Sequence, residues 1–225
     1  VWVAGSAAVA PLDAYLGEVV GALAALEDLE RTSNWRAISD TTIQIAADWK
    51  TSADMHNEAY HLPHLHPELS GRVDLNAVRQ TPLGAHHQLD FGVRATDETV
   101  QNVTQIHIFP NVQITLHPTR AMVLCHRAGR EVGRCEFDEM TLKLGDAGAA
   151  QCRPERVVVD SAQARIGAMA AADLRATEQL AHGLLGADHD LALHALEAGI
   201  WHNHVQLDRL LFGPLKQAGG GCSGD

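Results

Sequence analysis

Six short segments between residues 73 and 142 constrain the fold of this chain more than any other feature. Each is rich in β-branched or other apolar side chains, and they span residues 73–78, 85–93, 103–109, 112–117, 121–127 and 133–142. Turn-forming residues separate them, namely Pro82, Gly84, Asp97, Pro110, Asn111, Pro118 and Gly129. Short strands at such regular spacing predict an antiparallel meander.

Helical patterns flank these strands. Residues 11–31 carry an apolar stripe at helical spacing, a strand is predicted at 41–47, and Thr51 or Ser52 can cap a helix that follows it. Further helices are predicted at 161–185 and 190–199. Helices, then antiparallel strands, then helices indicate an α+β fold in which a curved sheet wraps around long helices. Such a sheet leaves a concavity in which an apolar substrate can bind.

The composition excludes several classes of protein. With 225 residues, 46% of them hydrophobic, the chain can form one domain with a substantial core. We expect that domain to cover residues 1–217, with a flexible tail at 218–225. The net charge of −11 argues against nucleic-acid binding, and no apolar run is long enough to cross a membrane.

The cysteines and the start of the chain predict where the protein resides. The four cysteines form no CxxC pair and no signal-peptide pattern is present, so we expect reduced thiols and a cytoplasmic protein. The chain opens on Val-Trp-Val, which resembles the middle of a strand. We therefore expect a fragment of a longer protein.

Residues 54–66 hold the candidate metal site. Asp54, Glu58 and His61 lie at helical spacing, so they share one face of a predicted helix that should end before Pro63. On an unbroken helix His66 would lie roughly 140° around the axis from His61, and a break at Pro63 lets it turn back. Two imidazoles and a carboxylate suit non-haem iron(II) and leave coordination positions open. Because the chain has 14 histidines, two surface histidines are the alternative.

A third ligand must come from a distant segment. We expect Asp190, at the start of the predicted helix 190–199, with Asp188 as its competitor. Either acid can instead be an exposed residue that the helix dipole favours. Glu58 lies one turn from His61 and can accept a hydrogen bond from the second ring nitrogen of a metal-bound histidine.

The chain resembles the catalytic domain of the Rieske-type non-haem iron oxygenases, the large alpha subunits of aromatic-ring-hydroxylating enzymes. Residues 48–50 (Asp-Trp-Lys) and 58–67 (Glu-Ala-Tyr-His-Leu-Pro-His-Leu-His-Pro) are similar to the family's Asn-Trp-Lys segment and its acid-x2-His-x4-His motif. Weaker similarities follow at 108–111, 116–118 and 135–138. The resemblance covers roughly residues 1–145 well.

The resemblance implies a helix-grip (START/Bet v 1-like) fold and a mononuclear Fe(2+) held by His61, His66 and a C-terminal acid, here Asp190. It implies that Glu58 is a catalytic bridge at a subunit boundary. Electrons would cross it from the Rieske [2Fe-2S] cluster of a neighbouring subunit in a homotrimer, supplied by a reductase or ferredoxin. The expected reaction is hydroxylation of a small apolar or aromatic substrate with O2, as a mono- or dioxygenase.

Two departures from the family leave alternatives open. The sequence has no Cys-x-His and no Cys-x2-His pair, so we expect the Rieske cluster on a missing domain or a partner. The C-terminal match is poor, because His189 falls at the family's acidic position before Gly199. A truncated, non-catalytic helix-grip module that binds an apolar ligand is the main alternative. A zinc hydrolase ranks below it, because no HExxH motif occurs.

Overall fold

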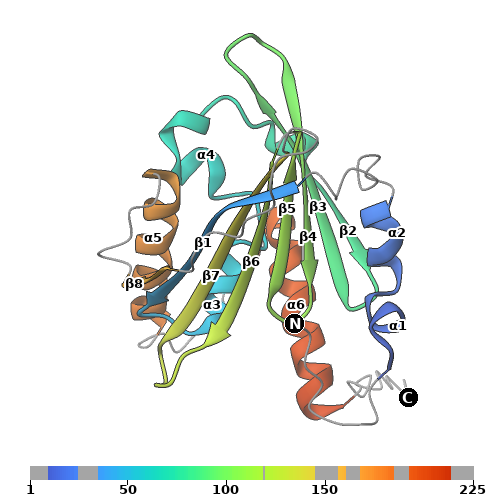
Figure 1. Cartoon of the computed structure of the whole chain (residues 1–225), viewed down its shortest axis with the longest axis vertical. Coiled ribbons are helices and arrows are strands. Elements are labelled where there is room, and N and C mark those ends of the chain that lie inside the picture. Colours follow the sequence, from blue (N-terminus) through green and yellow to red (C-terminus); the bar gives the residue numbers. More distant parts are fainter. Residues whose placement is uncertain are drawn as a thin grey trace, which may run out of the picture.

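The computed structural model describes residues 10–24, 35–118, 120–144, 157–160, 168–184 and 193–213. Their strands form a single eight-stranded sheet with the order β2-β3-β4-β5-β6-β7-β1-β8 (Figure 1). The strands are β1 Trp35–Ile45, β2 Arg79–Leu83, β3 His86–Arg94, β4 Val100–Ile108, β5 Val112–His117, β6 Arg120–Ala128, β7 Cys135–Leu144 and β8 Val157–Asp160. Neighbouring strands are antiparallel except β1 and β8, which run parallel.

The predicted meander is confirmed from β3 to β7. The first predicted strand, 73–78, is wrong: a short 3-10 helix, η3 Leu75–Ala77, occupies it and β2 begins at Arg79. Pro82 lies inside β2, which tolerates it because β2 is the edge strand and needs fewer backbone donors. The parallel strand β8 was not predicted.

The helices of the described residues are α1 Leu12–Leu16, α2 Glu18–Ala24, α3 Trp49–Met55, α4 Leu62–Leu65, α5 Ala168–Leu184 and α6 Ala198–Phe212, with 3-10 turns η2 Pro67–Leu69 and η4 Ala195–Glu197. Gly17, at φ 47°, separates α1 from α2 where one helix was predicted. The predicted helix 190–199 is only partly confirmed: residues 190–192 lie outside the described residues, residues 193 and 194 are not helical, and the α-helix extends beyond the predicted end to Phe212. A capping box between His194 and Glu197 precedes α6, which begins at Ala198.

Helices cover both faces of the sheet, so the predicted α+β class is confirmed. On one face Leu174 of α5 packs against Ile43, Leu124 and Phe137. On the other face Val19 of α2 packs against a second apolar cluster, which contains Leu83, Ile106 and Ile108. Figure 1 shows α5 beside β1 and β8, with α1 and α2 at the opposite side of the sheet. In the described part of the chain, every helix is too short or too polar to span a membrane.

Candidate metal centre

The chain reaches the site through a turn between two short helices. α3 ends at Met55, so the continuous helix predicted from Asp54 to His61 is wrong. Pro63 lies in the first turn of α4, a position that tolerates proline, and therefore starts a helix instead of ending one. His61 and His66 are the N-cap and C-cap of the short helix α4, and the extended backbone of His66 ends that helix. The predicted convergence is confirmed, because the two rings lie 5.5 Å apart, centroid to centroid.

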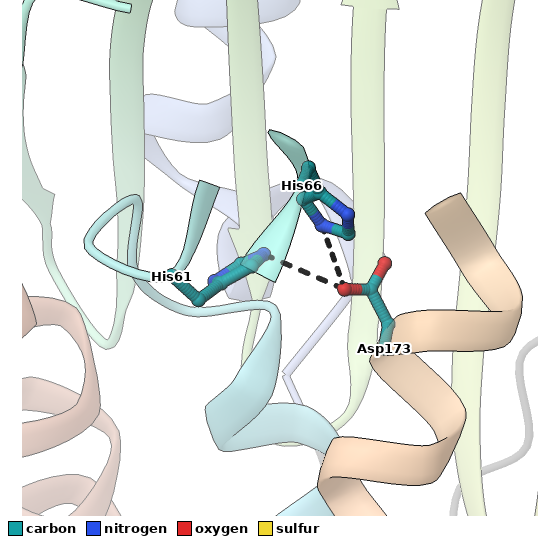
Figure 2. A group of neighbouring side chains, drawn as sticks. All are labelled: His61, His66 and Asp173. Carbon is teal, nitrogen blue, oxygen red and sulfur yellow. Dashed lines mark ion pairs between the residues drawn. The ribbon is translucent and has the colours of Figure 1, made fainter. Parts of the chain in front are cut away.

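Asp173 of α5 meets these two histidines (Figure 2). Its Oδ1 lies 2.9 Å from Nε2 of His66 and 3.8 Å from Nε2 of His61. One potential ligand atom from each of the three residues lies within 4.8 Å of the other two. Two imidazole nitrogens and one carboxylate oxygen are the donor set of mononuclear non-haem iron sites and of some zinc sites.

The burial of these groups indicates that a cation fits between them. His66 is only 1% exposed, and apart from the 2.9 Å contact of its Nε2 with Asp173, which is no hydrogen bond, its ring nitrogens have no polar partner among the described residues. Oδ1 of Asp173 is likewise buried without a hydrogen bond among those residues. Buried polar atoms normally have partners, because an unmade hydrogen bond leaves their desolvation uncompensated. A metal ion that binds Nε2 of His66 and Oδ1 of Asp173 would give both atoms the partner that they lack.

Glu58 orients His61. Its Oε2 accepts a hydrogen bond of 3.0 Å from the backbone N–H of His61, and its Oε1 contacts the ring Nδ1. The ring is thereby turned so that Nε2 faces Asp173. Burial acts to lower the pKa of His61, but the hydrogen bond and charge of Glu58, together with Asp173, outweigh it and raise that pKa. A metal-bound histidine usually donates its second ring N–H to such a carboxylate, which fixes the orientation of the ring.

The other predicted site residues lie elsewhere or outside the described part of the chain. Asp188 and Asp190 fall in residues 185–192, which the structure does not describe. Asp54 contacts His204 of α6 at 2.8 Å, and so belongs to a different pair. The sequence reasoning missed Asp173. The sequence marks Asp173 in one way: it is the single charged residue in the otherwise apolar run 166–174, where a carboxylate needs a partner.

A cavity of about 340 Å³ adjoins the three ligand candidates. This volume lies within the usual range for small-molecule sites. Most of its wall is apolar and comes from the sheet and from α4, η2 and α5: Ile43, Leu62, Leu69, Phe91, Val93, Val103, Met122, Leu124, Phe137, Met169 and Leu174. His56 also lines it, and burial lowers the pKa of that imidazole. The carbonyl of His56 accepts hydrogen bonds from the side chains of Gln105 and Gln113.

The fold is similar to that of solved Rieske monooxygenases. The quaternary ammonium Rieske monooxygenase CntA, in complex with an inhibitor, matches with a TM-score of 0.70 at 13% identity, over 90% of this chain and 56% of that one. Its complex with the substrate L-carnitine gives 0.65 at 12% identity, over 90% and 56%. Dicamba monooxygenase gives 0.51 at 8% identity, over 79% and 58%. This chain therefore spans just over half the length of these proteins.

Sequence comparison points to the same group. No curated protein sequence matches this chain significantly. The family profile described as "Ring hydroxylating alpha subunit (catalytic domain)" matches residues 32–212, which include all three ligand candidates and all eight described strands. The match covers well over half of the chain, and the chain therefore belongs to the family of ring-hydroxylating oxygenase alpha subunits, through their catalytic domain.

Proposed function

We propose that this domain hydroxylates a small organic substrate with O2 at a mononuclear non-haem iron held by His61, His66 and Asp173. The observation that carries the proposal is the convergence of these three side chains on the wall of a mostly apolar cavity. When bound, iron supplies the redox chemistry with O2, and the protein contributes binding and orientation.

The surrounding residues suit this role. Glu58 sets the ring of His61 so that Nε2 remains available, and burial shields His66 from water. Apolar side chains of the sheet and α5 form most of the cavity wall beside the ligands. A substrate in the cavity would therefore lie next to the iron and against mostly apolar side chains.

Electron supply requires a second component. We propose that a Rieske [2Fe-2S] domain of a neighbouring subunit, in a homotrimer, delivers electrons through Glu58 after reduction by a reductase or ferredoxin. Glu58 is 7% exposed, but Tyr60 two residues later is 46% exposed, so this segment reaches the surface. The solved structure of CntA is described as revealing inter-subunit electron transfer in that protein.

Iron analysis tests the proposed ligand set. We expect the anaerobically purified protein to contain about one iron per chain, and the double variant His61→Ala with His66→Ala to contain almost none. Asp173→Asn should lose most of the iron, because it removes the anionic ligand. Asp190→Asn is the matched variant for the acid predicted from the sequence.

Each outcome of this comparison decides one point. Iron loss in Asp173→Asn with iron retained in Asp190→Asn supports the proposed ligands. The reverse pattern would assign the third ligand to Asp190. Unchanged iron in the double histidine variant would overturn the proposal. Turnover with a supplied reductase and Rieske partner then separates an oxygenase from a non-catalytic module.

A further inference from the structure

His56 is an imidazole on the cavity wall that the metal centre does not use. It is the C-cap of α3, lies two residues before Glu58 and lines the cavity. It is not one of the three ligand candidates. Because most of the wall around it is apolar, each of its ring nitrogens needs a hydrogen-bond partner. Which nitrogen lacks one in the protein therefore indicates what the cavity accepts.

Every polar group of His56 except one has a partner within the protein. Its backbone N–H donates to the carbonyl of Ala53 at 3.0 Å, and its carbonyl accepts from the side chains of Gln105 at 2.6 Å and Gln113 at 3.0 Å. Its ring Nδ1 lies 2.9 Å from the carbonyl oxygen of Ser52. No described residue makes a hydrogen bond to Nε2, and protein atoms leave that nitrogen accessible. Because His56 borders the cavity, Nε2 opens into it.

The carbonyl of Ser52 fixes which ring nitrogen of His56 carries the hydrogen. A carbonyl oxygen can only accept, so Nδ1 donates to it. In a neutral imidazole the other nitrogen, Nε2, is then a bare acceptor. Burial lowers the pKa of His56, although Asp173 and the Ser52 carbonyl act to raise it, so the ring is neutral at pH 7. The cavity wall thus carries a hydrogen-bond acceptor without a donor of its own.

The position of this acceptor is fixed by packing. The ring of His56 stacks on that of Phe137, with centroids 5.3 Å apart and planes at 22°, and the ring of His126 lies 5.2 Å away. Asp173 acts on the pKa of His56 more strongly than any other charged group, so the acceptor lies near the metal centre. An acceptor that is already ordered costs a ligand little conformational entropy on binding.

We propose that His56 is a specificity-determining residue, whose Nε2 accepts a hydrogen bond from an N–H or O–H group of the substrate. The apolar body of the substrate then lies against the apolar wall beside the ligand candidates. A fixed acceptor discriminates against an analogue that lacks the donor, because that analogue leaves the acceptor enclosed and unpaired. The orientation toward iron rests on the proposed function. Binding of the donor at His56 does not.

A water molecule that stays on Nε2 when the substrate binds is the alternative partner. Such a water satisfies the acceptor in every complex. Ligands with and without a donor of the same shape would then bind equally well. The affinity difference within a pair of matched ligands therefore separates the two explanations.

Calorimetric titration of the purified protein under argon, without reductant, measures this difference. Para-ethylfluorobenzene matches para-ethylphenol in shape but has no donor. We expect the phenol to bind at least about tenfold more tightly, a difference of about 1.4 kcal/mol. His56→Phe keeps a stacked ring but removes the acceptor, and should weaken phenol binding about tenfold with the fluoro compound unchanged. His182→Phe, at an exposed histidine that does not line the cavity, is the control.

NMR of the histidine ring nitrogens tests the acceptor itself. Zinc-loaded protein is used because zinc is diamagnetic, and the signals of His56 are those absent from His56→Phe and His56→Gln. We expect the hydrogen on Nδ1 and none on Nε2. The Nε2 signal should shift when para-ethylphenol is added and stay in place with para-ethylfluorobenzene.

The outcomes separate this proposal from the proposed function. Equal affinity for the two compounds, unchanged phenol affinity in His56→Phe, no binding of the phenol, or a hydrogen on Nε2 overturns the role of His56. Circular dichroism shows whether each variant is folded, and the ligand pair in the parent protein decides if His56→Phe is not. Iron content is measured independently, so donor binding at His56 can stand if the iron assignment fails, and the reverse also holds.

Discussion

Glu58 is the residue whose chemistry can be tested most directly. It contacts both the backbone N–H and the ring of His61. Glu58→Gln keeps the size of the side chain but removes the charge that supports the imidazole. Loss of such a support typically costs about 10- to 100-fold in metal affinity. We expect the iron of Glu58→Gln to pass to a competing chelator at a correspondingly lower chelator concentration.

An exposed acid nearby provides the control for this experiment. Glu68 lies on η2 and its side chain is exposed. Glu68→Gln should hold iron as the parent does. Equal resistance of Glu58→Gln and Glu68→Gln to the chelator would show that Glu58 does not support His61.

At this scale the sequence revealed the local part of the site. His61, His66 and Glu58 lie within nine residues, so their spacing is visible in the sequence, and the prediction that the two imidazoles converge is confirmed. Asp173 reaches them only because α5 packs against α3. No local spacing encodes that contact, and so the sequence alone points to the acids at 188 and 190 instead.

Among the elements, α6 depends on a glycine for its position. A Cβ at Gly199 would lie 2.3 Å from the carbonyl oxygen of Asn57 and 2.7 Å from Nε2 of His87. Asn57 directly precedes Glu58, so a shift there disturbs the support of His61. We expect Gly199→Ala to lower the free energy of unfolding in urea by about 1–3 kcal/mol, as overpacking does, and to reduce iron content.

Gly183 offers a matched control on α5. It is exposed, and a Cβ there would meet nothing within 4 Å. Gly183→Ala should be neutral or stabilise the protein by up to about 1 kcal/mol, because alanine is the better helix former. If both alanine variants unfold at the same urea concentration, the close packing of α6 against residue 57 is not a feature of the protein in solution.

The start of α3 depends on Asp48. Its side chain accepts hydrogen bonds from the backbone N–H groups of Lys50 and Thr51, at 2.9 and 3.2 Å, and from the Thr51 hydroxyl at 2.7 Å. Asp48 is therefore the N-cap of α3, and the prediction that Thr51 or Ser52 caps this helix is wrong, because both lie inside it. Asp48→Ala should cost about 1 kcal/mol, measured by urea unfolding at neutral pH.

The effect of Asp48→Ala should also depend on pH. Burial raises the pKa of Asp48, but its hydrogen bonds to Thr51 and Lys50 outweigh burial and lower it below 3.8. A depressed carboxyl pKa contributes stability above the unfolded value, and this stability is lost as the pH falls through the folded value. The difference in the free energy of unfolding between Asp48→Ala and the parent should therefore become smaller in acid. If this difference does not change with pH, the capping contacts do not involve the charge of the Asp48 carboxylate.

Whole elements were predictable to different degrees. β3 to β7 were recognised because each is a β-branched or apolar run between turn residues. β8 was missed because it has four residues and pairs in parallel with β1, a contact that only the folded chain brings about. The break between α3 and α4 was missed because Asp54, Glu58 and His61 happen to follow helical spacing.

Across the whole molecule, buried histidines should make the fold sensitive to acid. His87, His107 and His126 are each at most 3% exposed. Burial, and secondarily His202 and His86, lower the pKa of His87 to about 3. Burial also lowers the pKa of His107 and His126 well below the usual 6.5, with other histidines adding to it. All three are therefore neutral in the folded protein, whereas in the unfolded chain they bind protons below about 6.5.

The unfolded state therefore gains protons first as the pH falls. The stability of the neutral, buried form is complete above about pH 6.5 and is lost progressively toward the folded pKa values. For His87 alone, two pH units below 6.5 cost about 2–3 kcal/mol. We expect urea unfolding followed against pH to show a steep fall of stability below about 6.5. His87→Gln, which stays neutral, should reduce that slope, while the exposed His182→Gln should leave it unchanged. If His87→Gln and His182→Gln give the same slope, water reaches His87 and its imidazole takes up protons in the folded protein.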